Sequence, residues 1–136
     1  MLVGIVSDSH DNVPMLRRAV EHFSAAGCEL VLHAGDVIAP FAMAVMDGLS
    51  CPFKAIYGNN DGEKVGLKLK AVAVGGSIQE PPLVVEKDKN GSRVGINPGE
   101  CGGWLTGSHT AALLDTGTLE VRIIDLSLDP GKEIPE

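Results

Sequence analysis

The opening stretch MLVGIVSDSHDN, at residues 1–12, is the most informative part of the chain, because its apolar run passes directly into polar residues. A short apolar run bounded in this way is typical of a buried strand. Asp11 and Asn12 can cap a helix after the strand, and Pro14 suits the first turn of that helix. Gly27 would end it. The stretch therefore predicts a buried strand that is followed directly by a helix.

The same sequence pattern occurs twice more along the chain. Residues 30–34 form a second apolar run before a Gly-Asp pair, and residues 53–57 form a third before Gly-Asn-Asn-Asp. Pro40 opens a helix between these two runs. Strand, helix, strand, helix and strand in this order predict parallel pairing with right-handed crossovers.

The second half of the chain has a different character. A short helix is expected over residues 62–73, and the rest is typical of strands separated by glycine-rich turns. The expected strands cover residues 83–86, 93–96, 111–114 and 119–126. Because 136 residues form about one core, we expect a single α/β domain over residues 1–136.

Composition excludes several classes of function. Eleven basic residues against eighteen acidic ones give a net charge of −7, so affinity for nucleic acid has no electrostatic driving force. No apolar run approaches the roughly 18 residues that span a membrane, and the N-terminus does not resemble a signal peptide. The three cysteines are an odd number and form no CxxC pair. We therefore expect a cytoplasmic protein without membrane partners. Formation of a homo-oligomer by pairing of sheet edges is a further alternative.

Polar clusters follow each of the first three predicted strands. They contain Asp8 and His10, then Asp36, then Asn59. Because the carboxyl ends of parallel strands meet at one edge of a sheet, these side chains can converge on one point. Carboxylate, imidazole and amide oxygen suit divalent metals. Asp and Asn also form turns at strand ends, but three clusters in succession favour a metal site. No G-x-G-x-x-G follows the first strand, which disfavours a dinucleotide-binding module.

The ordered motifs resemble those of the metallophosphoesterase, or calcineurin-like, superfamily. The matching motifs are Asp8-Ser9-His10, Gly35-Asp36, Gly58-Asn59-Asn60-Asp61 and Asn97-Pro98-Gly99-Glu100. The set is similar to that of small one-domain phosphodiesterases from bacteria and archaea. The resemblance implies a two-sheet α/β/β/α sandwich of the metallo-dependent phosphatase type. It also implies hydrolysis of a small phosphodiester by a hydroxide that two metal ions share.

The resemblance further implies roles for individual residues. Asp8, His10 and Asp36 would hold one ion. Asp36 and Asn59 would serve a second ion, with Asp36 as the bridge. Manganese is the expected metal, with Ni, Fe, Co, Mg and Zn as alternatives. Asn60 would hydrogen-bond the phosphate, and Asp61 would orient a neighbouring group.

One departure separates this chain from the superfamily pattern. The H-G and G-H-x-H segments expected between Asp61 and Asn97 are absent, because residues 62–96 contain no histidine. The charged turn near residues 88–91 marks the place of the missing segment. Either the polypeptide lacks this segment or the printed sequence omits it. Loss of these histidines favours a second hypothesis, a catalytically weak or inactive protein-binding scaffold like the retromer subunit of this superfamily.

The remaining histidines have simpler interpretations. His22 is expected to be an ordinary residue of the first helix, and His109 an ordinary loop residue. His33 ends the second predicted strand, beside the Gly-Asp pair. It either supports the metal ligands from behind or is a hydrogen-bonded histidine at the end of a strand.

Overall fold

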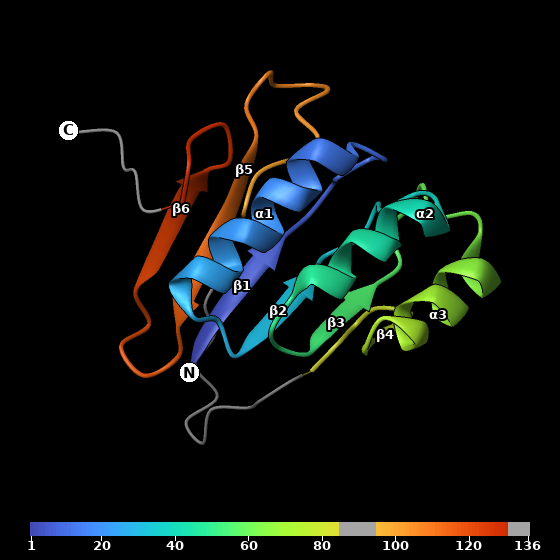
Figure 1. The fold of residues 1–136 in the computed structure, drawn as a ribbon, viewed down its shortest axis with the longest axis horizontal. Coiled ribbons are helices and arrows are strands. Elements are labelled where there is room, and N and C mark those ends of the chain that lie inside the picture. Colours follow the sequence, from blue (N-terminus) through green and yellow to red (C-terminus); the bar gives the residue numbers. More distant parts are fainter. Residues whose placement is uncertain (85–94, 131–136) are drawn as a thin grey trace.

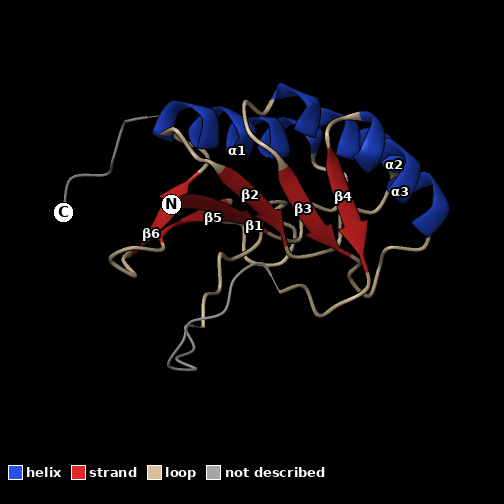
Figure 2. Ribbon diagram, turned by 90° about the horizontal axis from the view of Figure 1, so that it is seen from below, coloured by secondary structure: helices blue, strands red, loops and turns tan. Residues whose placement is uncertain are grey.

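The computed structural model describes residues 1–84 and 95–130. These residues form one six-stranded sheet, in the order β4-β3-β2-β1-β5-β6, with the helices packed on one face (Figures 1 and 2). The elements are β1 (Leu2–Val6), α1 (Val13–Ala26), β2 (Leu30–His33), α2 (Pro40–Met43), the 3-10 helix η1 (Ala44–Gly48), β3 (Phe53–Ile56), α3 (Lys64–Ala73), β4 (Gly76–Gln79), β5 (Thr110–Asp115) and β6 (Val121–Asp125).

The sheet is mixed. Strands β1 to β4 pair in parallel, and β5 and β6 are added antiparallel beyond β1. Val6 is paired with His33, and His33 with Ala55, so β1, β2 and β3 end at one edge (Figure 1). The polar turns after these three strands therefore start side by side, as the sequence pattern predicts.

Helix α1 follows the predicted signals closely. The side chain of Asn12 accepts a hydrogen bond from the backbone N–H of Met15, and Gly27 ends the helix at a left-handed φ of 77°. The helix lies against β1 through Phe23, which requires a glycine beneath it. A Cβ on Gly4 would lie 2.6 Å from the Phe23 ring. Gly4 thus sets how closely the helix approaches the sheet.

The main core lies between the sheet and the helices. Its largest fully buried side chains include Leu16 and Phe23 of α1, Phe53 of β3 and Leu67 of α3. Burying an aliphatic or aromatic side chain of this size contributes about 1.5–3 kcal/mol. Among the described residues, no helix is both long and apolar enough to cross a membrane.

The predictions for the second half are partly confirmed. The helix over 62–73 is present as α3, and the strands at 111–114 and 119–126 correspond to β5 and β6. Strand β4 was not predicted. The α/β class is confirmed, but the described residues form one sheet rather than two. Strands were also expected at residues 83–86 and 93–96. Their described residues, 83–84 and 95–96, have no regular secondary structure. The remaining residues, 85–94, lie outside the described part of the chain, and so does the expected gap at 88–91. Strands β5 and β6 extend the first sheet instead of building a second one.

Candidate metal centre

The turn after β1 presents two of the predicted ligands on an unusual backbone. Asp8 and His10 have φ values of 53° and 45°, in the left-handed region that side-chain-bearing residues rarely adopt. The turn is held in place by the neighbouring one. The N–H of Asp8 donates to the carbonyl of Gly35, and that of His10 donates to the carbonyl of Asp36, both at 3.0 Å. Such backbone strain is concentrated at functional sites in proteins.

Asp8, His10 and Asp36 converge as the sequence predicts. Each offers one ligand atom, and these atoms all lie within 4.8 Å of one another. Nε2 of His10 lies 3.4 Å from Oδ1 of Asp8 and 3.3 Å from Oδ2 of Asp36. Two donors bonded to one ion at about 2.1 Å are about 3.0–3.4 Å apart at octahedral or tetrahedral angles. The two separations from His10 therefore match those of ligands that share one divalent ion.

Asp36 is the buried member of this group. The residue is only 4% exposed, whereas Asp8 and His10 are both partly exposed. Asn60 donates to both carboxylate oxygens of Asp36, through its backbone N–H to Oδ1 and its side-chain amide to Oδ2, each at 2.9 Å. A buried carboxylate is costly unless it is hydrogen-bonded or bound to a cation. The environment of Asp36 suits a metal ligand held in a fixed orientation.

Asp61 fixes the backbone around Asp36. Its carboxylate accepts the N–H groups of Asp36 at 2.9 Å, Ile38 at 2.7 Å and Gly58 at 2.8 Å. It is 3% exposed, so these bonds are shielded from water. Asp61 thereby ties the turn after β2 to the turn after β3.

His33 joins two ligand-bearing turns from below. Its Nδ1 accepts the N–H of Gly35 at 3.1 Å, so the ring proton is on Nε2, which donates to Oγ of Ser9 at 3.0 Å. Ser9 lies between two predicted ligands, and Gly35 precedes the third. Burial lowers the pKa of His33 to about 4, against weaker raising effects from Asp61 and other carboxylates nearby. His33 is therefore neutral at pH 7 and supports the turns structurally.

The second predicted ion has a much poorer set of ligands. Asn59 lies exposed in the turn after β3, one residue before Asn60. Only two residues, Asp36 and Asn59, are predicted to bind this ion. The described residues 62–84 and 95–96 contribute no histidine. The described residues thus bring together the three predicted ligands of one ion and supply few for another.

A cavity of about 990 Å³ opens beside two of the predicted ligands, Asp8 and His10. Asn60 and residues of the loop from Asn97 to Thr106 also line it. The backbone of this loop runs alongside the turn after β1, because the N–H groups of Cys101 and Gly102 donate to the carbonyls of Ser7 and Asp8, both at 2.9 Å. Sequence analysis gave the Asn97–Glu100 motif but did not place Trp104 at the site. The one feature of the sequence that could have indicated this position is that the single tryptophan follows shortly after that motif.

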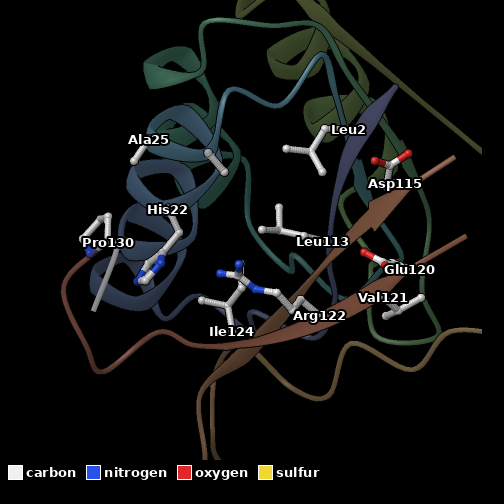
Figure 3. A pocket seen from close by; sticks show the side chains of 11 residues that line it. Leu2, His22, Ala25, Leu113, Asp115, Glu120, Val121, Arg122, Ile124 and Pro130 are labelled. Atoms are coloured by element: carbon white, nitrogen blue, oxygen red, sulfur yellow. The ribbon is translucent and has the colours of Figure 1, made fainter. Parts of the chain in front are cut away.

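The other histidines lie apart from the ligands. His22 of α1 donates from Nε2 to the carbonyl of Leu128 and faces a second cavity, of about 620 Å³, between α1 and the β5–β6 hairpin (Figure 3). His109 donates from Nδ1 to the carbonyl of Cys101. Both hold loops in place, in agreement with the sequence interpretation.

The fold and the candidate ligand cluster are those of a metal-dependent phosphoesterase. Comparison with known proteins identifies the superfamily. The pattern of the calcineurin-like phosphoesterase superfamily domain matches residues 1–81, more than half of the chain. The chain belongs to that superfamily. The resemblance seen in the motifs is confirmed.

Two relatives extend the similarity past residue 81. The chain is 34% identical over 165 positions to Phosphodiesterase MJ0936 of Methanocaldococcus jannaschii, an alignment covering 93% of this chain and 99% of that protein. It also resembles the solved structure of an archaeal phosphodiesterase, with a TM-score of 0.81, 30% identity and coverage of 92% of this chain and 99% of the other. Since 93% of 136 residues is about 127, about 38 of the 165 aligned positions have no counterpart in this chain.

Proposed function

We propose that this protein hydrolyses a small phosphodiester with the help of a divalent metal at Asp8, His10 and Asp36. The observation that carries the proposal is the convergence of these three side chains, at donor separations that suit a shared ion. Membership in the calcineurin-like phosphoesterase superfamily supports the reaction class. The archaeal relative named as a phosphodiesterase supports a diester as the substrate.

The chain's own residues supply binding and orientation. Asp8, His10 and Asp36 would hold a divalent ion, which would supply a Lewis acid for activating water and neutralising charge on the phosphoryl oxygens. The amide of Asn60 keeps Oδ2 of Asp36 directed at the site. In this proposal Asn60 also hydrogen-bonds the phosphate, through donor capacity beyond its bond to Asp36. An asparagine cannot deliver a proton, so the leaving group departs unaided or is protonated by water.

We also propose how many ions the site binds and which metal they are. Two ions, with manganese preferred, would follow the superfamily pattern, with Asp36 as the bridge and Asn59 on the second ion. Two donors bind such an ion weakly, so we expect tight binding of one ion and weak binding of the other. We also place the superfamily's histidine-bearing segment at the gap near residues 88–91. The alignment with the archaeal relative is longer than this chain, which supports a missing segment but does not locate it.

A protein-binding scaffold with little activity is the second candidate. The absence of histidine from residues 62–96 favours it, because the superfamily takes further metal and phosphate ligands from that region. We further propose a cytoplasmic location, which the three free cysteines support. Self-association would use an edge strand, β4 or β6.

The test measures manganese binding by calorimetry and hydrolysis of bis(4-nitrophenyl) phosphate on the same protein. The intact mass of the protein is measured first. A value of 14.2 kDa would mean that the tested protein carries no segment beyond the printed sequence. We expect Asp8→Asn and Asp36→Asn each to weaken manganese binding at least about 100-fold and to remove most activity, because both remove a direct ligand. Asp47→Asn, an exposed carboxylate on η1, is the matched control.

The outcomes separate the two candidates. Metal binding with hydrolysis that both ligand variants lose supports the enzyme. Metal binding without hydrolysis of the diester favours the scaffold. Wild-type rates in both ligand variants would contradict the assignment of the metal centre.

A further inference from the structure

The cavity at the metal centre is lined by both polar and apolar side chains. Asp8, His10 and Asn60 are among the polar ones, and the apolar ones include Ile38, Pro98, Trp104 and Leu105. A phosphate bound at the predicted metal ligands would therefore have apolar surface for its ester group in the same cavity. Ligand sites commonly combine an apolar lining with a few polar groups that fix orientation.

Trp104 is the largest side chain that lines this cavity. It is 68% exposed, although large aromatic surfaces are usually buried. Its indole Nε1–H donates to the backbone carbonyl of His10 at 3.2 Å. The polar atom of the ring is thus paired with the backbone of a metal ligand, and the exposed ring surface remains available for stacking.

The loop that carries Trp104 is held firmly against the ligand-bearing turn. The carboxylate of Glu100 accepts the N–H groups of Leu105 at 3.0 Å and Thr106 at 2.7 Å, and these bonds lower the pKa of Glu100. The side-chain amide of Asn12 donates to the carbonyl of Gly102 at 3.0 Å. Gly102 itself permits the contact, because a Cβ there would lie 2.8 Å from the carbonyl oxygen of Ser9. Trp104 therefore has a defined position relative to the metal ligands.

We propose that Trp104 determines specificity by stacking on an aromatic group esterified to the phosphate, so that the substrate is a phosphodiester carrying a nucleobase or an aryl ring. The inference rests on the proposed function, because that function places the phosphate at the metal centre. A neutral stacking surface also suits a chain of net charge −7, which offers little attraction to an extended polyanion. A small aromatic diester would use both the polar and the apolar side chains of the cavity.

The test compares two matched pairs of monoester ligands on the manganese-loaded protein. AMP and ribose 5-phosphate differ only by the base, and phenyl phosphate and methyl phosphate differ by the ring. Dissociation constants come from calorimetry. Quenching of the single tryptophan of the chain gives an independent signal in the wild type. The AMP and phenyl arms show whether the aromatic group is a base or an aryl ring.

We expect Trp104→Ala to weaken binding of AMP, phenyl phosphate or both about tenfold, the usual cost of removing one aromatic stacking partner. Binding of methyl phosphate and ribose 5-phosphate should change less than about twofold. Trp104→Phe keeps an aromatic ring without the indole N–H and should retain most of the preference. Leu69→Ala removes a side chain of similar exposure, 69%, on α3 and is the control.

Three other outcomes would overturn the inference. Equal losses for all four ligands would mean that Trp104 only maintains the site. Binding of methyl phosphate without any aromatic preference would leave the proposed function intact and remove the specificity role, so that Trp104 would be a protein-contact residue instead. Failure of all four ligands to bind would contradict both the inference and the phosphate site.

Discussion

Gly58 leaves the space that the carboxylate of Asp36 occupies. A Cβ on Gly58 would overlap Oδ1 of Asp36 and lie 2.5 Å from its backbone nitrogen. The preceding turn is equally restricted, since a Cβ on Gly35, at a φ of +108°, would lie 2.8 Å from the Cα of Gly58. The turns after β2 and β3 therefore touch through two glycines, and this contact places Asp36 at the site.

Substitution of Gly58 by Ala should damage the metal centre and the fold together. The added methyl group meets backbone as well as the carboxylate, so the turn must move. We expect the free energy of unfolding to fall by about 1–3 kcal/mol and metal affinity to fall with it. Urea unfolding and manganese calorimetry measure the two effects. Gly62→Ala is the matched control because a Cβ there meets nothing within 4 Å. Equal stability of the two variants would contradict the role of Gly58.

Substitution of Asp61 by Asn should destabilise the protein without removing a metal ligand. The amide retains one acceptor oxygen where the carboxylate accepts three backbone N–H groups. We expect a loss of about 3 kcal/mol in the free energy of unfolding, because buried N–H donors lose a charged acceptor. Metal affinity should fall less than it does in Asp36→Asn. A stability within experimental error of the wild type would show that these bonds contribute nothing net.

The stability of the metal-free protein should decrease as pH falls from about 6.5 towards 4. The unfolded chain protonates His33 near its usual pKa of about 6.5, whereas the buried ring stays neutral until about pH 4. Between these values the unfolded state binds more protons, so acidification favours unfolding by about 1.4 kcal/mol per pH unit. Urea unfolding at pH 7, 6 and 5 measures the slope. His33→Gln should show a shallower slope, and identical slopes would rule out the buried histidine as the cause.

Metal removal should lower the thermal stability of the wild type. An ion present at 100 times its dissociation constant stabilises the folded state by about 2.7 kcal/mol. For a chain of this length, that corresponds to roughly 10 °C in Tm. Thermal unfolding with manganese and with EDTA measures the difference. The shift should vanish in Asp8→Asn and persist in Asp47→Asn, and a shift of the same size in Asp8→Asn would point to an ion bound elsewhere.

Local signals in the sequence predict much of the fold. Helix α1 begins after Asn12 and ends at Gly27 as expected, because caps and left-handed glycines act over a few residues. Strand β4 had no comparable signal. Its four residues contain one apolar side chain, Ile78, which becomes buried only when β4 pairs with β3. The expectation of a second sheet came from the superfamily rather than from local patterns, and the described residues do not form it.

The sequence alone was enough to predict which three side chains come together at the candidate metal centre. Asp8, His10 and Asp36 follow parallel strands, and the geometry of such a sheet brings strand ends to one edge whatever the loops do. Tertiary structure alone decided what surrounds them. Asn60 turns its amide to Asp36, and Trp104 reaches the carbonyl of His10 across 94 positions of sequence. The second contact exists because β5 adds antiparallel to β1 and brings the preceding loop beside the ligands. Pairing between strands so distant in sequence depends on burial across the whole sheet, which no local pattern encodes.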